Sequence, residues 1–263
     1  MLKVEDLHLT FNKGTPIQTR ALQGMSLSIP TGQFVTVIGS NGAGKSTLLN
    51  AVAGEVKVDH GKIFLDNKNV TKQIGWRRAS TVARVFQDPM AGTCEDLSIE
   101  ENLSLAYSRG RKRGFRFALN HKNREFFKKK LAVLGLGLEH RLSDRIGLLS
   151  GGQRQAVSLL MATLQNSKIL LLDEHTAALD PRTADFVLQL TKKIVTSQKL
   201  TTMMVTHSMK QALELGERTI MLHQGKVVLD VAGEERAQLG VADLLEMFSK
   251  VRGLEIDDSL VLS

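Results

Sequence analysis

The spacing of hydrophobic and polar residues predicts short strands at the start of the chain. Alternating or short apolar runs indicate strands at Lys3–Thr10, near Ala21–Ile29, at Phe34–Ile38 and at Lys62–Leu65. The spacing of apolar residues then changes. The short apolar run FVTVIG is followed by the turn GSNGAG and then by KSTLLNAVAG, in which the leucines have helical spacing. This part of the chain is therefore predicted to form a strand, a loop and a helix.

Helical signals dominate from Asp88 to about Asn166, where Ser98, Glu100 and Glu101 open one helix in the manner of a capping box. Strands alternating with helices follow, which implies a mainly parallel sheet covered on both faces. The predicted strands are Ile169–Leu172, Thr201–Val205, Thr219–His223 and Lys226–Leu229, and the predicted helices lie near Arg182–Thr196 and Ser208–Leu215.

Two similar strings, at Gly61–Asp66 and Gly225–Asp230, are interpreted as hairpin arms, because nothing around them recurs at a fixed period. The last segment places a set of apolar residues on one helical face, and packing against its own domain is favoured over a partner groove. These residues are Val241, Leu244, Leu245, Phe248 and Val251.

Composition narrows the class of protein. The 263 residues suit one large domain, and 42% hydrophobic with 24% charged residues excludes global disorder. The longest apolar stretches are about half the ~20 residues of a membrane helix. A net charge of +8 is compatible with nucleic acid, anionic lipid or polyphosphate. Cys94 is the single cysteine, and no export signal opens the chain, so we expect a reducing, cytosolic compartment.

The string Gly39–Ser46 fits G-x-x-x-x-G-K-[ST], placed between a predicted strand and a predicted helix. Glycines let backbone N–H groups curve around phosphates, and the following helix presents its positive end to them. Lys45 is predicted to contact the β and γ oxygens and Ser46 to hold Mg²⁺.

The run LLLDE at Leu170–Glu174 predicts a buried strand that ends in two acids. Ligands of parallel sheets lie outside the carboxyl ends of the strands, so Asp173 is predicted to bind Mg²⁺ and Glu174 to polarise the attacking water. Leu149–Gln153, LSGGQ, begins an apolar-periodic helix that Ser150 can cap and that a phosphate can approach. An ordinary helix cap is the alternative for each motif.

Taken together, these motifs resemble those of an ABC-transporter ATPase subunit. GSNGAGKST, VFQDP, LSGGQRQ, LLLDE, AALD and VTHS occur in that family's order and approximate spacing over roughly residues 1–230. The resemblance implies an α/β fold: a P-loop NTPase core with a mainly parallel sheet, an N-terminal antiparallel β subdomain and an inserted α-helical subdomain. It divides a single domain, 1–263, into a nucleotide-binding core (1–87 and 166–230), a helical subdomain (88–165) and a C-terminal helical tail (231–263).

The family resemblance also implies ATP and Mg²⁺ as cofactors, and a head-to-tail pair of copies that sandwiches ATP between the phosphate loop of one and the LSGGQ helix of the other. Gln87, Glu174 and His207 would act at the γ-phosphate and attacking water, and Mg²⁺ would be held by Ser46, Gln87 and Asp173. The implied nucleotide-binding residues are Phe11, Gly39, Ser40, Asn41, Gly42, Ala43, Gly44, Lys45, Ser46, Thr47, Ser150, Gly151, Gly152, Gln153 and Asp180.

Three residues carry open alternatives. Phe11 is placed to stack on adenine, with a core phenylalanine as the alternative. Gln87 is interpreted as the residue that couples to the membrane subunit, although alone it would be an ordinary loop residue. His175 replaces the family's usual proline, and a solvated or capping histidine is favoured over one that approaches the nucleotide.

The expected function is that of an ATPase bound to the cytoplasmic face of the membrane, beneath a separate permease, in an importer with an extracytoplasmic substrate-binding protein. DEHTAALDP and the segment after Gln87 resemble importers of the amino-acid or tryptophan type. An exporter, a soluble ABC protein acting on nucleic acid or ribosomes, and a small-molecule kinase are the alternatives. Nucleic acid is disfavoured, since Phe115, Phe117, Phe126 and Phe127 have helical spacing that suits a core. The basic stretch Arg109–Lys130 is interpreted as a solvated surface, with anionic lipid as the alternative.

Overall fold

The computed structural model describes residues 1–110 and 119–250. Its internal contacts divide the chain into two compact units. The first unit comprises Met1–Ala51, Val56–Thr71 and Met203–Ser263, and the second comprises Val52–Glu55 and Lys72–Thr202. Over these described ranges, none of the helices combines the length and the apolar character needed to cross a membrane.

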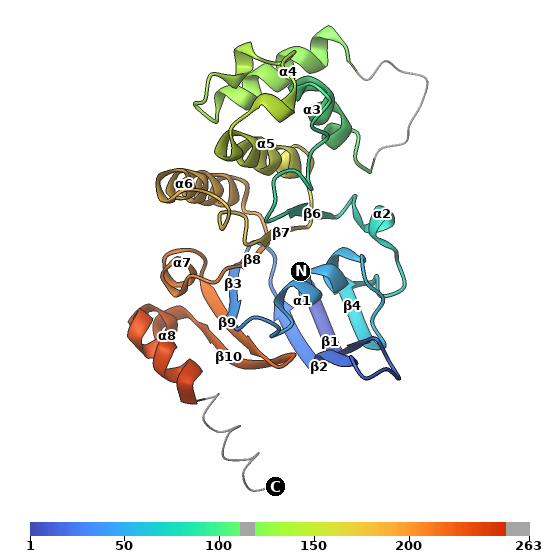
Figure 1. Cartoon of the computed structure of the whole chain (residues 1–263), viewed down its shortest axis with the longest axis vertical. Helices are drawn as coiled ribbons and strands as arrows, with labels where there is room; N and C mark the ends of the chain where they lie inside the picture. Colours follow the sequence, from blue (N-terminus) through green and yellow to red (C-terminus); the bar gives the residue numbers. More distant parts are fainter. Residues whose placement is uncertain (111–118, 251–263) are drawn as a thin grey trace, which may run out of the picture. The chain divides into compact units, whose positions relative to one another are not determined.

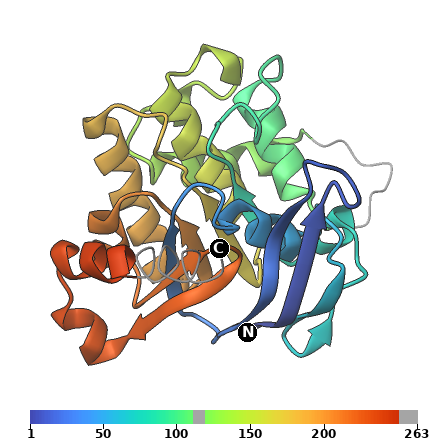
Figure 2. The same ribbon diagram turned by 60° about the horizontal axis from the view of Figure 1, so that its bottom comes forward.

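The first unit contains an antiparallel sheet whose strand order is β2-β1-β4-β5. Its strands are β1 (Leu2–Phe11), β2 (Thr19–Ile29), β4 (His60–Leu65) and β5 (Lys68–Asn69). The long strands β1 and β2 run side by side (Figures 1 and 2). Alternate residues of β1, such as Leu2 and Leu9, are buried, which agrees with the two-residue period of the sequence.

A second group of strands carries the phosphate loop. These strands are β3 (Phe34–Gly39), β8 (Thr202–Val205), β9 (Arg218–His223) and β10 (Lys226–Ala232). β9 pairs in parallel with β3 and antiparallel with β10. The helices of this unit are α1 (Lys45–Ala53), which starts in it, α7 (Met209–Glu214) and α8 (Gly233–Gln238). The predicted strand, loop and helix around the glycine-rich string are therefore confirmed.

Both predicted hairpin arms are confirmed. β4 leads into β5 through Asp66 and Asn67, whose φ angles are +48° and +63°. β9 leads into β10 through Gln224 and Gly225, with φ angles of +42° and +73°. Two consecutive residues with positive φ are typical of the type I′ turn that suits the twist of a hairpin.

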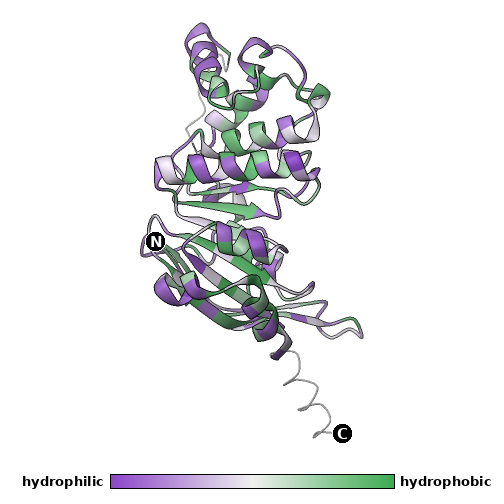
Figure 3. Ribbon diagram, turned by 90° about the vertical axis from the view of Figure 1, so that its left-hand side faces the viewer, coloured by the Kyte–Doolittle hydropathy of each residue, from purple (hydrophilic) through white to green (hydrophobic). Residues whose placement is uncertain are grey.

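The second unit holds a parallel strand pair, β6 (Val82–Val85) and β7 (Ile169–Asp173). Its helices are α2 (Gly75–Arg78), α3 (Ile99–Tyr107), α4 (His121–Ala132), α5 (Gly151–Thr163) and α6 (Pro181–Gln198), with 3₁₀ turns at Leu138–His140 and Ile146–Leu148. The capping box at the start of α3 is confirmed, since Ser98 and Glu101 exchange side-chain and backbone hydrogen bonds. Figure 3 shows hydrophobic residues concentrated on strands, while hydrophobic and hydrophilic residues alternate along the helices.

The C-terminal part of the described chain, residues 241–250, is helical and contributes to the core of the first unit. Leu244 is completely buried and Phe248 packs against the same cluster, so packing against its own domain is confirmed for these two residues. Val241 and Leu245 are 41% and 49% exposed, so the prediction that they share the buried face is wrong. Val251 lies outside the described residues.

The described ends of the basic stretch are only partly solvated. Arg109 donates from Nη2 to the Ala162 carbonyl (3.0 Å) and to Ser167 Oγ (2.9 Å), and burial lowers its pKa. This corrects the interpretation of Arg109 as a solvated residue, because its guanidinium closes the end of α5. Phe127 is 1% exposed and packs edge-on against Tyr107, as a core residue does. Phe115 and Phe117 lie outside the described residues.

Candidate functional site

The phosphate loop lies in the first unit, between the end of β3 and the start of α1. Two of its glycines are required by close backbone approaches: a Cβ at Gly39 would lie 2.2 Å from the Leu222 carbonyl oxygen, and one at Gly44 would lie 2.5 Å from that of Ala21. A Cβ at Gly42, in contrast, would meet nothing within 4 Å. The loop is therefore packed against the strands on one side and open on the other.

Lys45 is the charged group of this loop. Its side chain is buried, and Nζ donates to the carbonyl oxygens of Gly39 (2.9 Å) and Ser40 (3.0 Å). The ammonium group is thus held inside the curve of the loop, beside the first amides of α1. A helix N-terminus together with a positive side chain favours an anion such as a phosphate group.

Two further predicted residues of the first unit are exposed. Phe11, at the end of β1, is 38% exposed, so the alternative of a core phenylalanine is wrong and its ring is accessible. His207 follows β8 in a loop that is fixed on both sides. Before it, the Thr206 amide donates to the Val37 carbonyl (3.1 Å), and after it Ser208 caps α7 by accepting from the Gln211 amide.

In the second unit, β7 is buried along its whole length and ends at Asp173. The Asp173 carboxylate accepts a hydrogen bond of 2.6 Å from Arg84 Nη2, and Arg84 Nη1 donates to Glu55 at 2.5 Å. The side chains of Arg84 and Asp173 are 10% and 12% exposed. A charge-assisted pair with so little exposure holds the carboxylate in a fixed orientation. Arg84 was not predicted as a site residue, because its only signal in the sequence is one cation inside the apolar run VARV.

The backbone turns sharply after Asp173. Glu174 has a φ of +45°, a conformation that costs a non-glycine residue about 1–3 kcal/mol and that is concentrated at functional sites. The turn leaves Glu174 partly exposed and directs His175 inward. The site therefore presents one carboxylate to solvent and keeps its two neighbours in the interior.

His175 is 2% exposed, which corrects the expectation of a solvated or capping histidine. Its Nε2 lies 3.0 Å from Thr191 Oγ1, and the Thr191 hydroxyl donates its only proton to the Val187 carbonyl at 2.8 Å. Thr191 must therefore accept from His175, so Nε2 is the protonated ring nitrogen. Burial lowers the pKa of His175 to about 4.

Gln87 lies two residues after the end of β6, and its side chain is exposed. The preceding carbonyl, of Phe86, accepts a hydrogen bond of 3.1 Å from Nε2 of Gln155, which is completely buried in α5. Gln155 was not singled out from the sequence, although it belongs to the run GGQRQ. Its hydrogen bond ties the segment that carries Gln87 to the helix that begins with LSGGQ.

The LSGGQ segment begins α5 with a second capping box. Ser150 Oγ accepts from the Gln153 amide at 3.3 Å, and the Gln153 side chain accepts from the Ser150 amide at 3.2 Å. Gly151 is exposed, whereas Gly152 is buried and a Cβ on it would lie 2.0 Å from Thr183 Cγ2. Of these two glycines, only Gly151 has a backbone that an anion can reach. Gly152 allows α5 to pack closely against Thr183 of α6.

Asp180 lies beside this segment, at the start of α6. Its carboxylate accepts from the Thr183 amide at 3.1 Å, and the hydrogen bonds from Thr183 lower the pKa of Asp180. A Cβ at Gly151 would also be in contact with Leu179, at 3.5 Å. The structure thus brings together the start of α5 and the loop that ends in Asp180, the two segments of this unit predicted to face a second copy.

Known proteins match this chain over most of its length. A family model described as ABC transporter matches residues 22–177. The tyrosine transport ATP-binding protein of Clostridioides difficile (strain R20291) is 45% identical over 248 residues, which cover 94% of this chain and 98% of that protein. The energy-coupling factor transporter ATP-binding protein EcfA2 of Clostridium tetani (strain Massachusetts / E88) is 31% identical over 250 residues, with coverages of 93% and 83%.

A solved structure supports the same assignment. The ATP-binding cassette MJ0796, determined as a dimer in a post-hydrolysis state with ADP and Pi, has a TM-score of 0.75 and 29% identity. The alignment covers 88% of this chain and 98% of that one. The fold and the phosphate loop define a P-loop ATPase cassette, and the chain belongs to the ABC transporter family. It is an ATP-binding and ATP-hydrolysing protein whose activity is coupled to transport, which confirms the prediction at this level and excludes the kinase alternative.

Proposed function

We propose that this chain is the ATPase subunit of a bacterial importer for an aromatic amino acid of the tyrosine or tryptophan type. The observation that carries the proposal is the match to a tyrosine transport ATP-binding protein along nearly the full length of both chains. We assign the translocation path to a separate permease.

ATP hydrolysis would use the residues that the family resemblance assigns to it. The phosphate loop and Lys45 bind the phosphates, and Phe11 offers an exposed ring for the adenine. Glu174 acts as the general base that polarises the attacking water, and its strained backbone fixes the direction of its carboxylate. His207 orients the γ-phosphate and the water.

Mg²⁺ fits the donor set that the resemblance assigns to it. Ser46, Gln87 and Asp173 offer a hydroxyl, an amide and a carboxylate oxygen, and oxygen atoms are the ligands that Mg²⁺ prefers. When bound, the ion would neutralise charge on the β and γ oxygens. Arg84 holds the Asp173 carboxylate in place for this task.

A second copy would complete each nucleotide site. Gly151, whose backbone is exposed, and the N-cap residue Ser150 lie at the N-terminus of α5, where the helix dipole favours an anion. The Asp180 loop packs against the same segment, so both form one surface of the second unit. We assign this surface to the γ-phosphate bound by the other copy, in a head-to-tail pair.

The permease would dock beside Gln87. A groove of about 390 Å³ in the second unit is lined by residues that follow Gln87, including Asp88, Pro89 and Cys94, together with Leu105 of α3 and Met161 of α5. Because Gln155 ties the same segment to α5, a displacement in the groove would be transmitted to both Gln87 and the LSGGQ helix. This docking places the protein at the cytoplasmic face of the membrane.

The proposal is tested by purifying the complex from membranes through a tag on this chain. We expect an integral membrane permease to accompany it. After reconstitution with the extracytoplasmic binding protein, tyrosine or tryptophan should stimulate ATP hydrolysis, whereas arginine should not. Stimulation by a polynucleotide, with no membrane protein recovered, would overturn the proposal in favour of a soluble ABC protein.

A further inference from the structure

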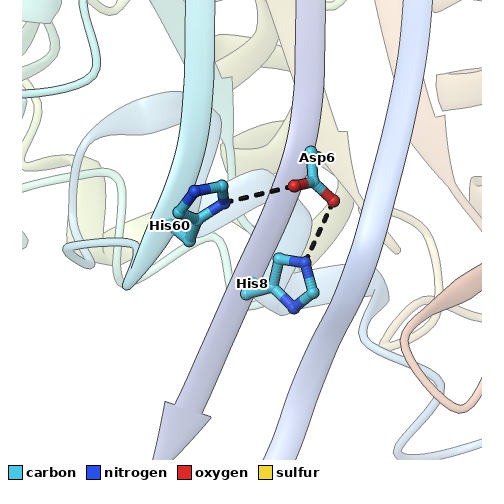
Figure 4. Close-up of side chains that lie close together, drawn as sticks. All are labelled: Asp6, His8 and His60. Carbon is cyan, nitrogen blue, oxygen red and sulfur yellow. Dashed lines mark hydrogen bonds and ion pairs between the residues drawn. The ribbon is translucent and has the colours of Figure 1, made fainter.

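Three side chains outside the nucleotide-binding residues converge on the exposed face of the antiparallel sheet. Asp6 and His8 belong to β1, and His60 begins β4 (Figure 4). The Asp6 carboxylate lies between the two imidazole rings. Its Oδ1 is 3.0 Å from His8 Nε2, and its Oδ2 is 3.2 Å from His60 Nδ1. One potential ligand atom from each residue lies within 4.8 Å of the other two.

The backbone explains why these three residues meet. His8 and His60 are directly opposite each other in the β1–β4 pairing. The register shifts between Glu5 and His8, and Asp6 has a φ of +47°. This irregularity places Asp6 on the exposed side together with His8, while Leu7 between them is completely buried. A β-bulge is a common device for redirecting a side chain toward a site.

The space beside the three residues is kept open by a glycine. Gly24, in the neighbouring strand β2, has no side chain, and a Cβ there would lie 3.4 Å from Asp6 Oδ1 and 3.6 Å from His8 Nε2. Gly24 therefore leaves one side of the potential ligand atoms uncovered.

The donor set and its dimensions suit a transition-metal ion. Imidazole nitrogens together with a carboxylate oxygen are frequent ligands of Zn²⁺, which binds them at about 2.0–2.2 Å, so tetrahedral ligand atoms are about 3.3 Å apart. The separation of His8 Nε2 from Asp6 Oδ1 already has nearly this length, while His60 Nδ1 faces the other carboxylate oxygen, Oδ2. Because one ligand atom from each residue lies within 4.8 Å of the other two, closing the site around an ion requires a movement of His60, whose side chain is 72% exposed.

We infer that Asp6, His8 and His60 form a binding site for a divalent first-row transition ion, with Zn²⁺ as its representative and water completing the coordination. The ion joins β1 to β4 at the end of their pairing, where the ladder is interrupted by the bulge. Because it binds the folded sheet and not the unfolded chain, it raises the thermal stability of the protein.

The test is calorimetric titration of the nucleotide-free, untagged full chain with Zn²⁺ in the presence of excess Mg²⁺. The wild type should bind one ion at this site with micromolar affinity. His8→Ala, His60→Ala and Asp6→Asn should each weaken that binding at least tenfold. His140→Ala is the matched control, because His140 is 84% exposed and lies beside the carboxylate of Glu139. It should bind as the wild type does.

A second readout separates ligand loss from misfolding. Without metal, all variants should have the thermal midpoint of the wild type, since the three side chains are exposed, and added Zn²⁺ should raise the midpoint of the wild type and His140→Ala only. The visible spectrum of bound Co²⁺ should show nitrogen ligation that disappears in His8→Ala. Absence of Zn²⁺ binding by the wild type, or binding by His8→Ala or His60→Ala as tight as that of the wild type, would overturn the inference.

Discussion

The buried histidine next to Glu174 should make the stability of the protein depend on pH in a way that one substitution removes. His175 is enclosed between β7 and α6 and donates from Nε2 to Thr191. Protonation at Nδ1 would place a charge in an interior where no water solvates it. Replacement by glutamine gives a side chain that is neutral at every pH and can still reach Thr191.

The size and sign of the effect follow from the two pKa values. The ordinary pKa of histidine is 6.5, and burial lowers that of His175 to about 4. Above pH 6.5 the ring is neutral in both states and pH has no effect through this group. As the pH falls below 6.5, only the unfolded chain gains the proton, so the folded state loses stability until the pH reaches about 4. By linkage, the free energy of unfolding falls by about 2 kcal/mol at pH 5 and by about 3 kcal/mol once the pH is below the pKa of the folded state.

The assay is urea unfolding followed by circular dichroism at pH 7.5, 6 and 5. Between pH 7.5 and 5 the wild type should lose about 2 kcal/mol more than His175→Gln, because other titrating groups are common to both proteins and cancel. His140→Gln, which replaces an exposed histidine, should follow the wild type. If the free-energy difference between the wild type and His175→Gln stays constant over this range, the ring is not buried in its neutral form and the reasoning is refuted.

Further substitutions probe the site. Glu174→Gln should retain ATP binding but lose about 10²–10⁴ in turnover, measured as phosphate release; normal turnover would remove Glu174 from catalysis. Lys45→Ala should weaken ATP binding in calorimetry, and unchanged affinity would contradict its place in the loop. Arg84→Ala should lower the free energy of unfolding by about 3 kcal/mol, because the buried Asp173 carboxylate loses its ion pair. Arg84→Lys, which keeps a positive charge, should lower it by less. Gly152→Ala should reduce ATPase activity by displacing α5 from Thr183, and Thr183→Ser, which removes the clashing methyl group, should restore it.

The sequence correctly predicted those features whose interacting residues all lie close together along the chain. The capping box at Ser98, the helix cap at Ser150 and the phosphate loop each depend on residues within eight positions, and all three have the expected hydrogen bonds or bounds. The strand β6 was missed, because Arg84 interrupts its apolar run. That arginine faces Asp173, 89 positions later, and such a partner has no local signature.

The same distinction explains why the residue after Glu174 was assigned to the surface. A histidine that follows two acids in sequence resembles a polar loop residue, and its burial depends on Thr191, sixteen positions away on α6. The alternation of side-chain directions along a strand is no guide to burial here, because β7 is buried on both faces from Ile169 to Asp173.

Backbone strain, burial and charge at the end of β7 can be understood together. Asp173 and His175 are both buried, each held by a partner from a different element, Arg84 for the carboxylate and Thr191 for the imidazole. These two anchors constrain the chain on either side of Glu174 and hold it in a conformation that it would not adopt alone. If that is their role, Thr191→Val, which removes the hydrogen bond to His175 but keeps the shape of the side chain, should lower turnover without altering ATP affinity. Unchanged turnover in this variant, with the fold intact, would show that the strain at Glu174 is maintained by other contacts.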